Sequence, residues 1–232
     1  EIYTLSLHDA LPIWSAKDIE SISTRSGVFA GIHEREMRHA IKIGLTGGIG
    51  SGKSMVSKLL TTYEIAVYDS DTRAKSLMET DDKIIHSITQ IFGKEAYTDG
   101  KLNRRFVAEA VFASSSKLLQ INTIVHSAVI DDFSRWAELQ AAHILVFESA
   151  IIFENGLEKY FDKIIAVVAP QKLRIERVKR RSGLSRKEIL NRIKNQTSSK
   201  TLRQRADYVV INDDRTTPTR SEERRVGKEC RS

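Results

Sequence analysis

The sequence predicts an α/β fold, in which a five-stranded parallel sheet is flanked by helices and carries a helical insertion and a helical lid. Short apolar runs of strand length recur along the chain and alternate with helical patterns, as in parallel sheets. A glycine-rich loop follows the first run directly and opens a helix. Residues 81–142 show only helical periodicity, which is too much helix for one crossover between strands and therefore indicates an inserted subdomain.

The first predicted strand, Ile41–Thr46, leads into residues 47–54, GGIGSGKS, which fit the pattern G-x-x-x-x-G-K-[ST]. Glycines allow consecutive backbone N–H groups to surround phosphate oxygens where a Cβ would clash. Lys53 adds a positive charge for the β and γ phosphates, Ser54 offers a hydroxyl to Mg²⁺, and the helix that follows turns its positive end toward the same phosphates. The alternative is a glycine-rich turn with a chance Lys-Ser pair. Because an apolar helical pattern follows, the motif predicts a nucleotide-binding loop of the P-loop NTPase type.

We exclude both ends of the chain from the predicted folded domain. One choice of codons for residues 1–13 has a reverse complement that encodes residues 221–232 in one frame. Natural termini have no reason to encode each other on opposite strands, so we expect residues 1–13 and 220–232 to derive from a sequencing adapter. Residues 14–40 are expected to be read-through or an extension around a start at Met37, which leaves residues 41–219 as the folded domain.

The composition excludes several classes of protein. The only cysteine, Cys230, lies in a segment that we set apart, so we expect no disulfide framework. No apolar run approaches the length of a membrane span, and we expect a soluble, cytoplasmic protein without a membrane partner. The net charge is +7, but residues 172–200 alone carry eleven Lys or Arg against two Glu. This segment has no aromatic residue to stack on bases, so we expect a lid that faces phosphates and no nucleic-acid partner.

The second predicted strand, residues 65–68, ends in Asp69-Ser70-Asp71 and delivers two carboxylates to the edge of the sheet where ligands bind. A carboxylate there can accept the proton of a substrate hydroxyl during phosphoryl transfer, and we favour Asp71 for this role. The alternative is that Asp71 only caps the helix predicted over residues 72–79.

The insertion, about residues 72–142, is expected to be helical throughout, broken at Asp99-Gly100 and without any strand. An insertion at this place is expected to hold the second substrate. His126 within it is either a satisfied core histidine or a substrate contact.

Three further strands are predicted, over residues 143–148, 163–168 and 207–211. Glu148 ends the first of them, where P-loop enzymes often keep an acidic residue near Mg²⁺, and Glu154 follows at a Glu-Asn-Gly loop.

Two helices, residues 171–181 and 185–196, are predicted between the last two strands and form the expected lid, about residues 171–200. Arg174, Arg177 and Arg181 share one face of the first helix, at i, i+3 and i+7. Arginines in this arrangement can clamp transferring phosphates, and we expect Arg177 and Arg181 to touch the ATP phosphates only when the helix pair closes, and to lie far from Lys53 before that. The alternative is a solvated charged face, and the glycine loop upstream favours the lid.

With these motifs, the chain from about residue 41 to residue 213 resembles the dephospho-CoA kinases. The resemblance rests on the glycine loop, the Asp-x-Asp after the second strand, Leu102 with Phe112, the loop 148–154 (ESAIIFE) and the Arg-x-x-x-Arg of the lid. It implies transfer of the γ-phosphoryl group of ATP, with Mg²⁺, to the ribose 3′-hydroxyl of dephospho-CoA, the last step of CoA synthesis. It also implies that the helical insertion binds dephospho-CoA.

The resemblance further implies roles for individual residues. Asp71 matches the general base, and Arg177 and Arg181 match lid arginines that act with Lys53 on the transferred phosphoryl group. The ATP-binding positions are Gly50, Ser51, Gly52, Lys53, Ser54 and Met55. The candidate substrate contacts are Asp69, Lys75, His126 and Glu154, and the candidate Mg²⁺ ligands are Ser54 and Glu148. The family often has Arg where this chain has Lys75, which loses a bidentate phosphate contact, and usually has Pro where this chain has Ser127 and Ala150.

Two other functions share parts of this pattern. Another small-molecule P-loop kinase, such as a nucleoside monophosphate kinase, would differ in the acceptor pocket of the insertion. A basic nucleic-acid-binding ATPase would bind DNA in a salt-sensitive way without turnover of small acceptors. A regulatory GTPase is excluded, because the sequence contains no Asn-Lys-x-Asp guanine motif.

Overall fold

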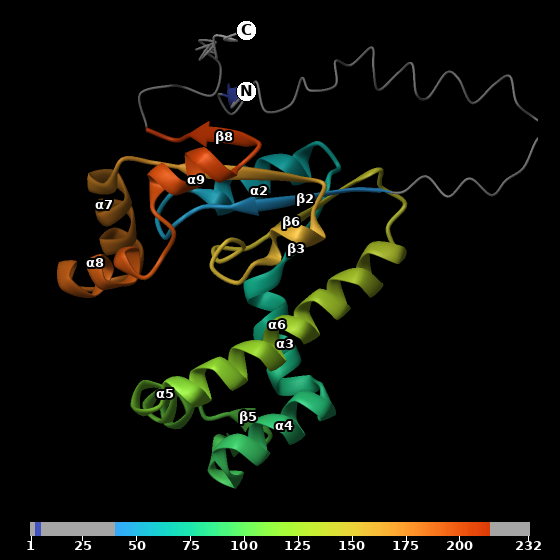
Figure 1. Cartoon of the computed structure of the whole chain (residues 1–232), viewed down its shortest axis with the longest axis vertical. Coiled ribbons are helices and arrows are strands. Elements are labelled where there is room, and N and C mark those ends of the chain that lie inside the picture. The colour runs from blue at the N-terminus through green and yellow to red at the C-terminus, as the bar shows by residue number, and fades with distance from the viewer. Residues whose placement is uncertain (1–2, 6–39, 214–232) are drawn as a thin grey trace, which may run out of the picture. The chain divides into compact units, whose positions relative to one another are not determined.

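The computed structural model describes residues 3–5 and 40–213, which belong to two compact units (Figure 1). The described residues of 1–67 and 142–232 form the sheet unit, and residues 68–141 form the helical unit. The segments expected to be adapter-derived, read-through or an extension lie outside the described residues, apart from residues 3–5 and residue 40.

The chain forms a parallel sheet with the strand order β1-β8-β7-β2-β6-β3, and all of its strands belong to the sheet unit except the last two residues of β3. The strands are β1 (Tyr3–Leu5), β2 (Ile41–Thr46), β3 (Ala66–Asp69), β6 (Ile144–Glu148), β7 (Lys163–Val168) and β8 (Tyr208–Ile211). The five predicted strands are confirmed, each within one residue at either end, but the prediction omitted β1, which pairs in parallel with β8. An edge strand such as β8 offers main-chain N–H and C=O groups to any extended segment, so this pairing requires no recognisable pattern in the sequence.

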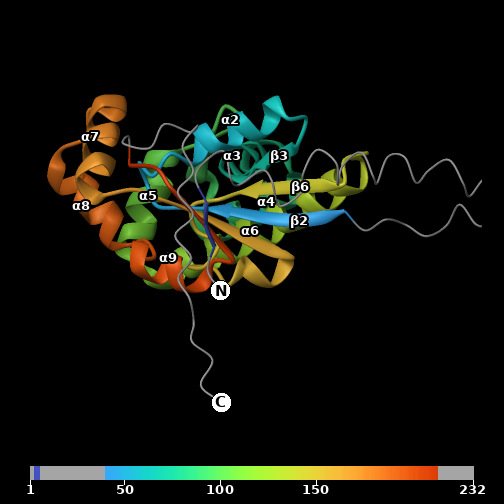
Figure 2. The same ribbon diagram turned by 90° about the horizontal axis from the view of Figure 1, so that it is seen from above.

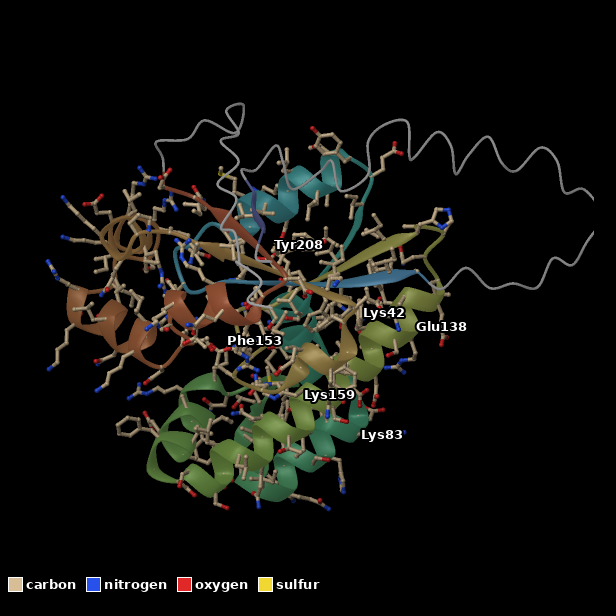
Figure 3. All side chains as sticks on the ribbon, turned by 45° about the horizontal axis from the view of Figure 1, so that its top comes forward. Lys42, Lys83, Glu138, Phe153, Lys159 and Tyr208 are labelled. Atoms are coloured by element: carbon tan, nitrogen blue, oxygen red, sulfur yellow. The ribbon has the colours of Figure 1, made fainter. Side chains whose placement is uncertain are left out.

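The core of the sheet unit lies where β2 runs between β6 and β7. The helix α2 (Lys53–Thr62), which follows the glycine loop, packs on this part of the sheet in a core of Leu45, Val56, Leu60, Val146, Ile165, Val167 and Val210. Tyr208, labelled in Figure 3, packs against the same core. The helix α9 (Ser199–Arg205) contacts β7 and β8, and Figure 2 shows it across the sheet from α2. Because the strands are parallel, the segments that follow β2, β6, β7 and β8 meet at one edge of the sheet.

Between residues 168 and 208, all of which the structure describes, the chain forms three helices: α7 (Gln171–Ser182), α8 (Arg186–Lys194) and α9. α7 and α8 are the predicted pair. Gly183, with φ of 66°, ends α7, and Ser185 and Glu188 form a capping box at the start of α8. α9 was not predicted, because a helix of seven residues in which only Leu202 is buried leaves no helical periodicity in the sequence.

The helical unit contains α3 (Ser70–Thr80), α4 (Asp82–Phe92), α5 (Arg104–Ala113) and α6 (Ser115–Glu138), and short 3₁₀ turns occur at η2 (Lys94–Ala96) and, in the sheet unit, η3 (Leu157–Tyr160). Helices α3, α4 and α5 all contact α6, and Figure 1 shows α5 at the start of α6. In the described part of the chain, no helix combines the length and the apolarity needed to cross a membrane.

The expectation that no strand interrupts the insertion is wrong. β4 (Tyr97–Thr98) and β5 (Lys101–Leu102) form an antiparallel hairpin. Asp99 and Gly100 have φ of 50° and 74°, the positive values that a two-residue hairpin turn requires. Two-residue strands are too short to show alternation, so only the turn was visible in the sequence.

Candidate functional site

The glycine loop between β2 and α2 holds a conformation that depends on glycine. Gly50 and Gly52 have φ of 75° and 100°, values that residues with a Cβ rarely adopt. A Cβ on Gly48 would lie 2.2 Å from Nη2 of Arg174, and one on Gly52 would lie 2.1 Å from Nδ2 of Asn212. The loop therefore needs glycine both for its backbone conformation and for the close approach of side chains from α7 and from the end of β8.

Polar groups suited to an anion lie along this loop. Lys53 is the first residue of α2, and its Nζ donates to Gly47 O at 2.9 Å, which holds the ammonium group against the loop. Ser54 follows in the first turn of α2 and is exposed, as is Met55. The hydroxyls of Thr46 and Ser51 are buried and have no hydrogen-bond partner among the described residues. Buried donors without partners, beside the N-terminus of a helix, fit a loop that accepts a polyanion.

Ile49, within the loop, is held through both of its backbone polar groups. Arg174 on α7 donates from Nε to Ile49 O at 2.9 Å, and Ile49 N donates to Oε1 of Gln196 at 2.8 Å. Arg174 is only 4 % exposed, and this burial lowers its pKa because the charged guanidinium is removed from water. Arg174 belongs to the predicted arginine stripe, whereas no local sequence pattern marks Gln196.

Arg177 and Asn212 hold the next part of the loop. Asn212, immediately after β8, donates from Nδ2 to Ser51 O at 3.0 Å, and its Oδ1 accepts from Nη2 of Arg177 at 3.0 Å. Nη1 of Arg177 lies 3.4 Å from the carbonyl oxygens of both Gly50 and Ser51. Arg177 therefore lies against the glycine loop, where the loop carbonyls and Asn212 offer it acceptors, and its contact with the ATP phosphates on closure of the lid stays a prediction. Arg181 is exposed and has no hydrogen-bond partner among the described residues.

Glu148, the last residue of β6, and Glu154, in the segment that follows this strand, make different contacts. Oε2 of Glu148 accepts from Oγ of Ser57 at 2.5 Å, so the carboxylate lies against α2, the helix that the glycine loop opens. Oε1 of Glu154 accepts from the backbone N of Thr197 at 2.5 Å, which ties this segment to the linker between α8 and α9. The structure thus shows an intramolecular role for Glu154, and its contact with a substrate stays a prediction.

In the helical unit, Asp69 and Asp71 take different places at the start of α3. Asp69 caps the helix, because its carboxylate accepts from the backbone N of Thr72 at 3.1 Å and from the Thr72 hydroxyl at 2.7 Å. Asp71 lies in the first turn and is exposed, and Lys75 follows one turn later, also exposed. The alternative in which Asp71 caps this helix is wrong, because α3 begins at Ser70 and Asp69 has the extended backbone of a cap residue. The role of Asp71 as a base stays a prediction.

A polar cluster of Tyr68, Arg73 and Asp132 joins α3 to α6, and no pattern in the sequence predicts it. Arg73 donates to Asp132 from Nε at 2.8 Å and from Nη2 at 2.7 Å, and the Tyr68 hydroxyl donates to the same carboxylate at 2.6 Å. The hydrogen bonds from Arg73 lower the pKa of Asp132, and burial raises the pKa of Tyr68. The cluster fixes α3, which carries Asp71, on α6. His126, on α6, is half-buried, and burial lowers its pKa and favours the neutral imidazole.

Known proteins resemble this chain over most of its length. The family model described as "CoaE: Dephospho-CoA kinase" matches residues 41–217. The dephospho-CoA kinase of Bacteroides fragilis (strain YCH46) is 42% identical over 175 residues, which are 75% of this chain and 85% of that protein. The dephospho-CoA kinase of Porphyromonas gingivalis (strain ATCC BAA-308 / W83) is 40% identical over 173 residues, 74% of this chain and 86% of that one.

A solved structure agrees with the same assignment. The crystal structure of TT1252 from Thermus thermophilus matches with a TM-score of 0.68 and 35% identity, and the match covers 75% of this chain and 89% of that one. These findings confirm both the predicted fold class and the resemblance drawn from the glycine loop, the Asp-x-Asp and the lid arginines. The chain belongs to the dephospho-CoA kinase family.

Proposed function

We propose that the chain transfers the γ-phosphoryl group of ATP to the ribose 3′-hydroxyl of dephospho-CoA, which yields CoA and ADP in the last step of CoA biosynthesis. The observation that carries the proposal is the glycine loop with Lys53, held in place by side chains from α7 and β8, in a chain of this family. Family membership favours dephospho-CoA over a nucleoside monophosphate as the acceptor. A cytoplasmic location, without a nucleic-acid partner, is part of the proposal.

The loop residues would bind the phosphates of ATP. Residues 50–55 supply backbone N–H groups, and α2 supplies its positive end. Lys53 would exchange its bond to Gly47 O for the β and γ phosphates. Arg177, already at the loop, and Arg181, from the next turn of α7, would stabilise the negative charge that develops on the γ-phosphoryl oxygens.

Mg²⁺ fits the residues of the sheet unit, and Ser54 and Glu148 are its proposed ligands. Among the described residues, no three His, Cys, Asp or Glu side chains gather into a metal site of their own. Mg²⁺ does not need such a cluster, because it usually takes one or two protein ligands and completes its coordination shell with phosphate and water oxygens. Ser57 keeps Glu148 beside α2, on which Ser54 lies. When bound, Mg²⁺ neutralises charge that develops on the phosphate oxygens.

Asp71 is the proposed general base. Its carboxylate would accept the proton of the 3′-hydroxyl while that oxygen forms a bond to the γ-phosphorus. The bond from this phosphorus to the β–γ bridging oxygen breaks, and ADP leaves. Asp69 is less suited to the role, because its carboxylate already accepts two hydrogen bonds as the cap of α3. Lys75, His126 and Glu154 are the further proposed contacts with dephospho-CoA.

The test is the rate of ADP release with dephospho-CoA, adenosine or AMP as the acceptor, at fixed ATP and Mg²⁺. We expect turnover with dephospho-CoA well above that with the other two, and loss of turnover in Lys53→Ala and in the presence of EDTA. Equal rates with AMP and dephospho-CoA would refute the assignment of the acceptor. Salt-sensitive binding to DNA in a gel-shift assay, without any ADP release, would favour the nucleic-acid-binding alternative.

A further inference from the structure

A cavity of about 630 Å³ lies within the sheet unit, between the start of α7, the end of α8 and the start of α9. Three basic side chains line it, those of Arg174, Lys194 and Arg203, and each comes from a different helix. Asp213 also lines it, as does Ser199, which brings a hydroxyl group. Positive charges outnumber negative ones, so the cavity attracts anions.

The cavity is separate from the place proposed for the ATP phosphates. On β8, Val210 packs into the core beneath α2, so the next residue, Ile211, faces the other side of the sheet. Ile211 lines the cavity together with residues of α9, the helix that Figure 2 shows across the sheet from α2. Lys53 and Ser54, at the start of α2, do not line it. A ligand in the cavity would therefore leave the glycine loop free for nucleotide.

One nitrogen of the buried Arg174 guanidinium, Nη2, is without a hydrogen-bond partner among the described residues, and it lies against Gly48 of the glycine loop. The Nε of the same guanidinium donates to Ile49 O. Buried polar side-chain atoms are mostly paired, and the lowered pKa of Arg174 reflects the removal of its charge from water. An anion in the cavity, which Arg174 lines, would offer the buried guanidinium a compensating negative charge.

We propose that the cavity binds a phosphate dianion, either free or as the ester of a small molecule, on Arg174, Lys194 and Arg203. Arginine suits phosphate because its planar group donates two parallel hydrogen bonds. A volume of about 630 Å³ lies within the range of cavities that hold small organic ligands, so an ester fits as well as the free ion.

The cavity is connected to the glycine loop through two of its lining side chains. Arg174 and Gln196 both line it, and they bind the carbonyl oxygen and the N–H group of Ile49. An anion that engages the Arg174 guanidinium changes the hydrogen bond that this group makes to the loop. Phosphate and nucleotide are therefore expected to change each other's affinity, by the same factor in both directions.

The experiment is calorimetric titration of inorganic phosphate, and separately of glycerol phosphate, into the full chain with Lys53→Ala, which weakens competing binding at the loop. Saturable binding is expected for at least one probe, and the two titrations show whether the free ion or the ester is preferred. Adding Lys194→Ala and Arg203→Ala is expected to weaken binding by about tenfold or more, since two charged partners are lost. Lys187→Ala is the matched control, because this exposed lysine of α8 does not line the cavity.

Two results would overturn the site: no saturable binding at millimolar probe, or equal binding with and without Lys194 and Arg203 in variants that circular dichroism shows to be folded. For the coupling, the affinity for a non-hydrolysable ATP analogue is measured with and without phosphate. The measurement is made on two chains that both keep Lys53: the unsubstituted chain and the variant Lys194→Ala/Arg203→Ala. Phosphate competes with the ATP analogue at the glycine loop equally in both chains, so any difference between them comes from the cavity. The effect of phosphate is expected to differ between them, and an identical effect would overturn the coupling.

Discussion

The hydrogen bonds of Asn212 predict a measurable loss of stability in the variant Asn212→Ala. The substitution removes the bond from Nδ2 to Ser51 O and the bond that Oδ1 accepts from the Arg177 guanidinium, both 3.0 Å long. A neutral hydrogen bond contributes about 1 kcal/mol and one to a charged group about 1.5–3 kcal/mol. Because Asn212 and Arg177 are half-buried, we take the lower end and expect the free energy of unfolding to fall by roughly 2 kcal/mol.

Thermal unfolding of the full chain measures this loss. For a protein of this size, each kcal/mol shifts Tm by about 2–4 °C, so Asn212→Ala is expected to melt about 4–8 °C lower. Asn191→Ala is the matched control, because Asn191 is an exposed asparagine of α8. Its Tm is expected to stay within about 2 °C of that of the unsubstituted chain.

A double-mutant cycle with Arg177→Ala isolates the pair. Because Asn212 and Arg177 share a hydrogen bond, a coupling free energy of about 1–2 kcal/mol is expected. Additive losses, with a coupling near zero, would refute the inference that Asn212 supports the loop through Arg177. A loss in Asn212→Ala no larger than that in Asn191→Ala would refute the whole argument from its hydrogen bonds.

The remaining predictions concern catalysis and pH. Asp71→Asn keeps the shape of the side chain and loses its basicity, so kcat should fall at least about 100-fold with little change in KM, and a fully active variant would exclude Asp71 as the base. Asp69→Ala should instead lower the free energy of unfolding by about 1 kcal/mol through loss of the helix cap, as chemical denaturation would show. Arg181→Ala should lower kcat without changing Tm, since the side chain is exposed. Arg177→Ala should lower both kcat and Tm, because its guanidinium binds Asn212. An unchanged kcat in both variants would refute the lid assignment. Burial lowers the pKa of His126, so its neutral form contributes stability above about pH 6.5 that is lost as the pH falls below that value toward the folded pKa. The free energy of unfolding, measured by chemical denaturation at about pH 7.5 and about pH 5.5, should therefore differ less between the two pH values in His126→Gln than in the unsubstituted chain. An equal difference in both chains would contradict this.

The glycine loop and the strands around it could be predicted because their signals are local. Residues 47–54 carry their own pattern, and each predicted strand is a short apolar run at its observed place. At the start of α3, the pattern located the Asp-x-Asp but could not tell which carboxylate caps the helix. That distinction depends on where the extended backbone ends, at Asp69, and a shift of one residue decides it.

The supports of the loop could not be predicted, because they join residues far apart in the chain. Asn212 and Ser51 are separated by 161 positions, and Gln196 and Ile49 by 147. Each contact exists only once the sheet and the lid helices have packed, so a single glutamine or asparagine gives no pattern in the sequence. A polar residue directly after a predicted strand, as Asn212 is, was the one available signal.

The support that Asn212 gives to the loop has a consequence for the order of events during synthesis. The chain that forms β8 is made long after residues 47–54 have left the ribosome. A nascent chain that stops before β8 therefore carries the whole glycine loop but not the side chain that binds Ser51 O. The full set of contacts that hold the loop therefore forms only once β8 has paired with β7. Nucleotide is therefore expected to stabilise chains in which β8 has docked more than chains that stop before it.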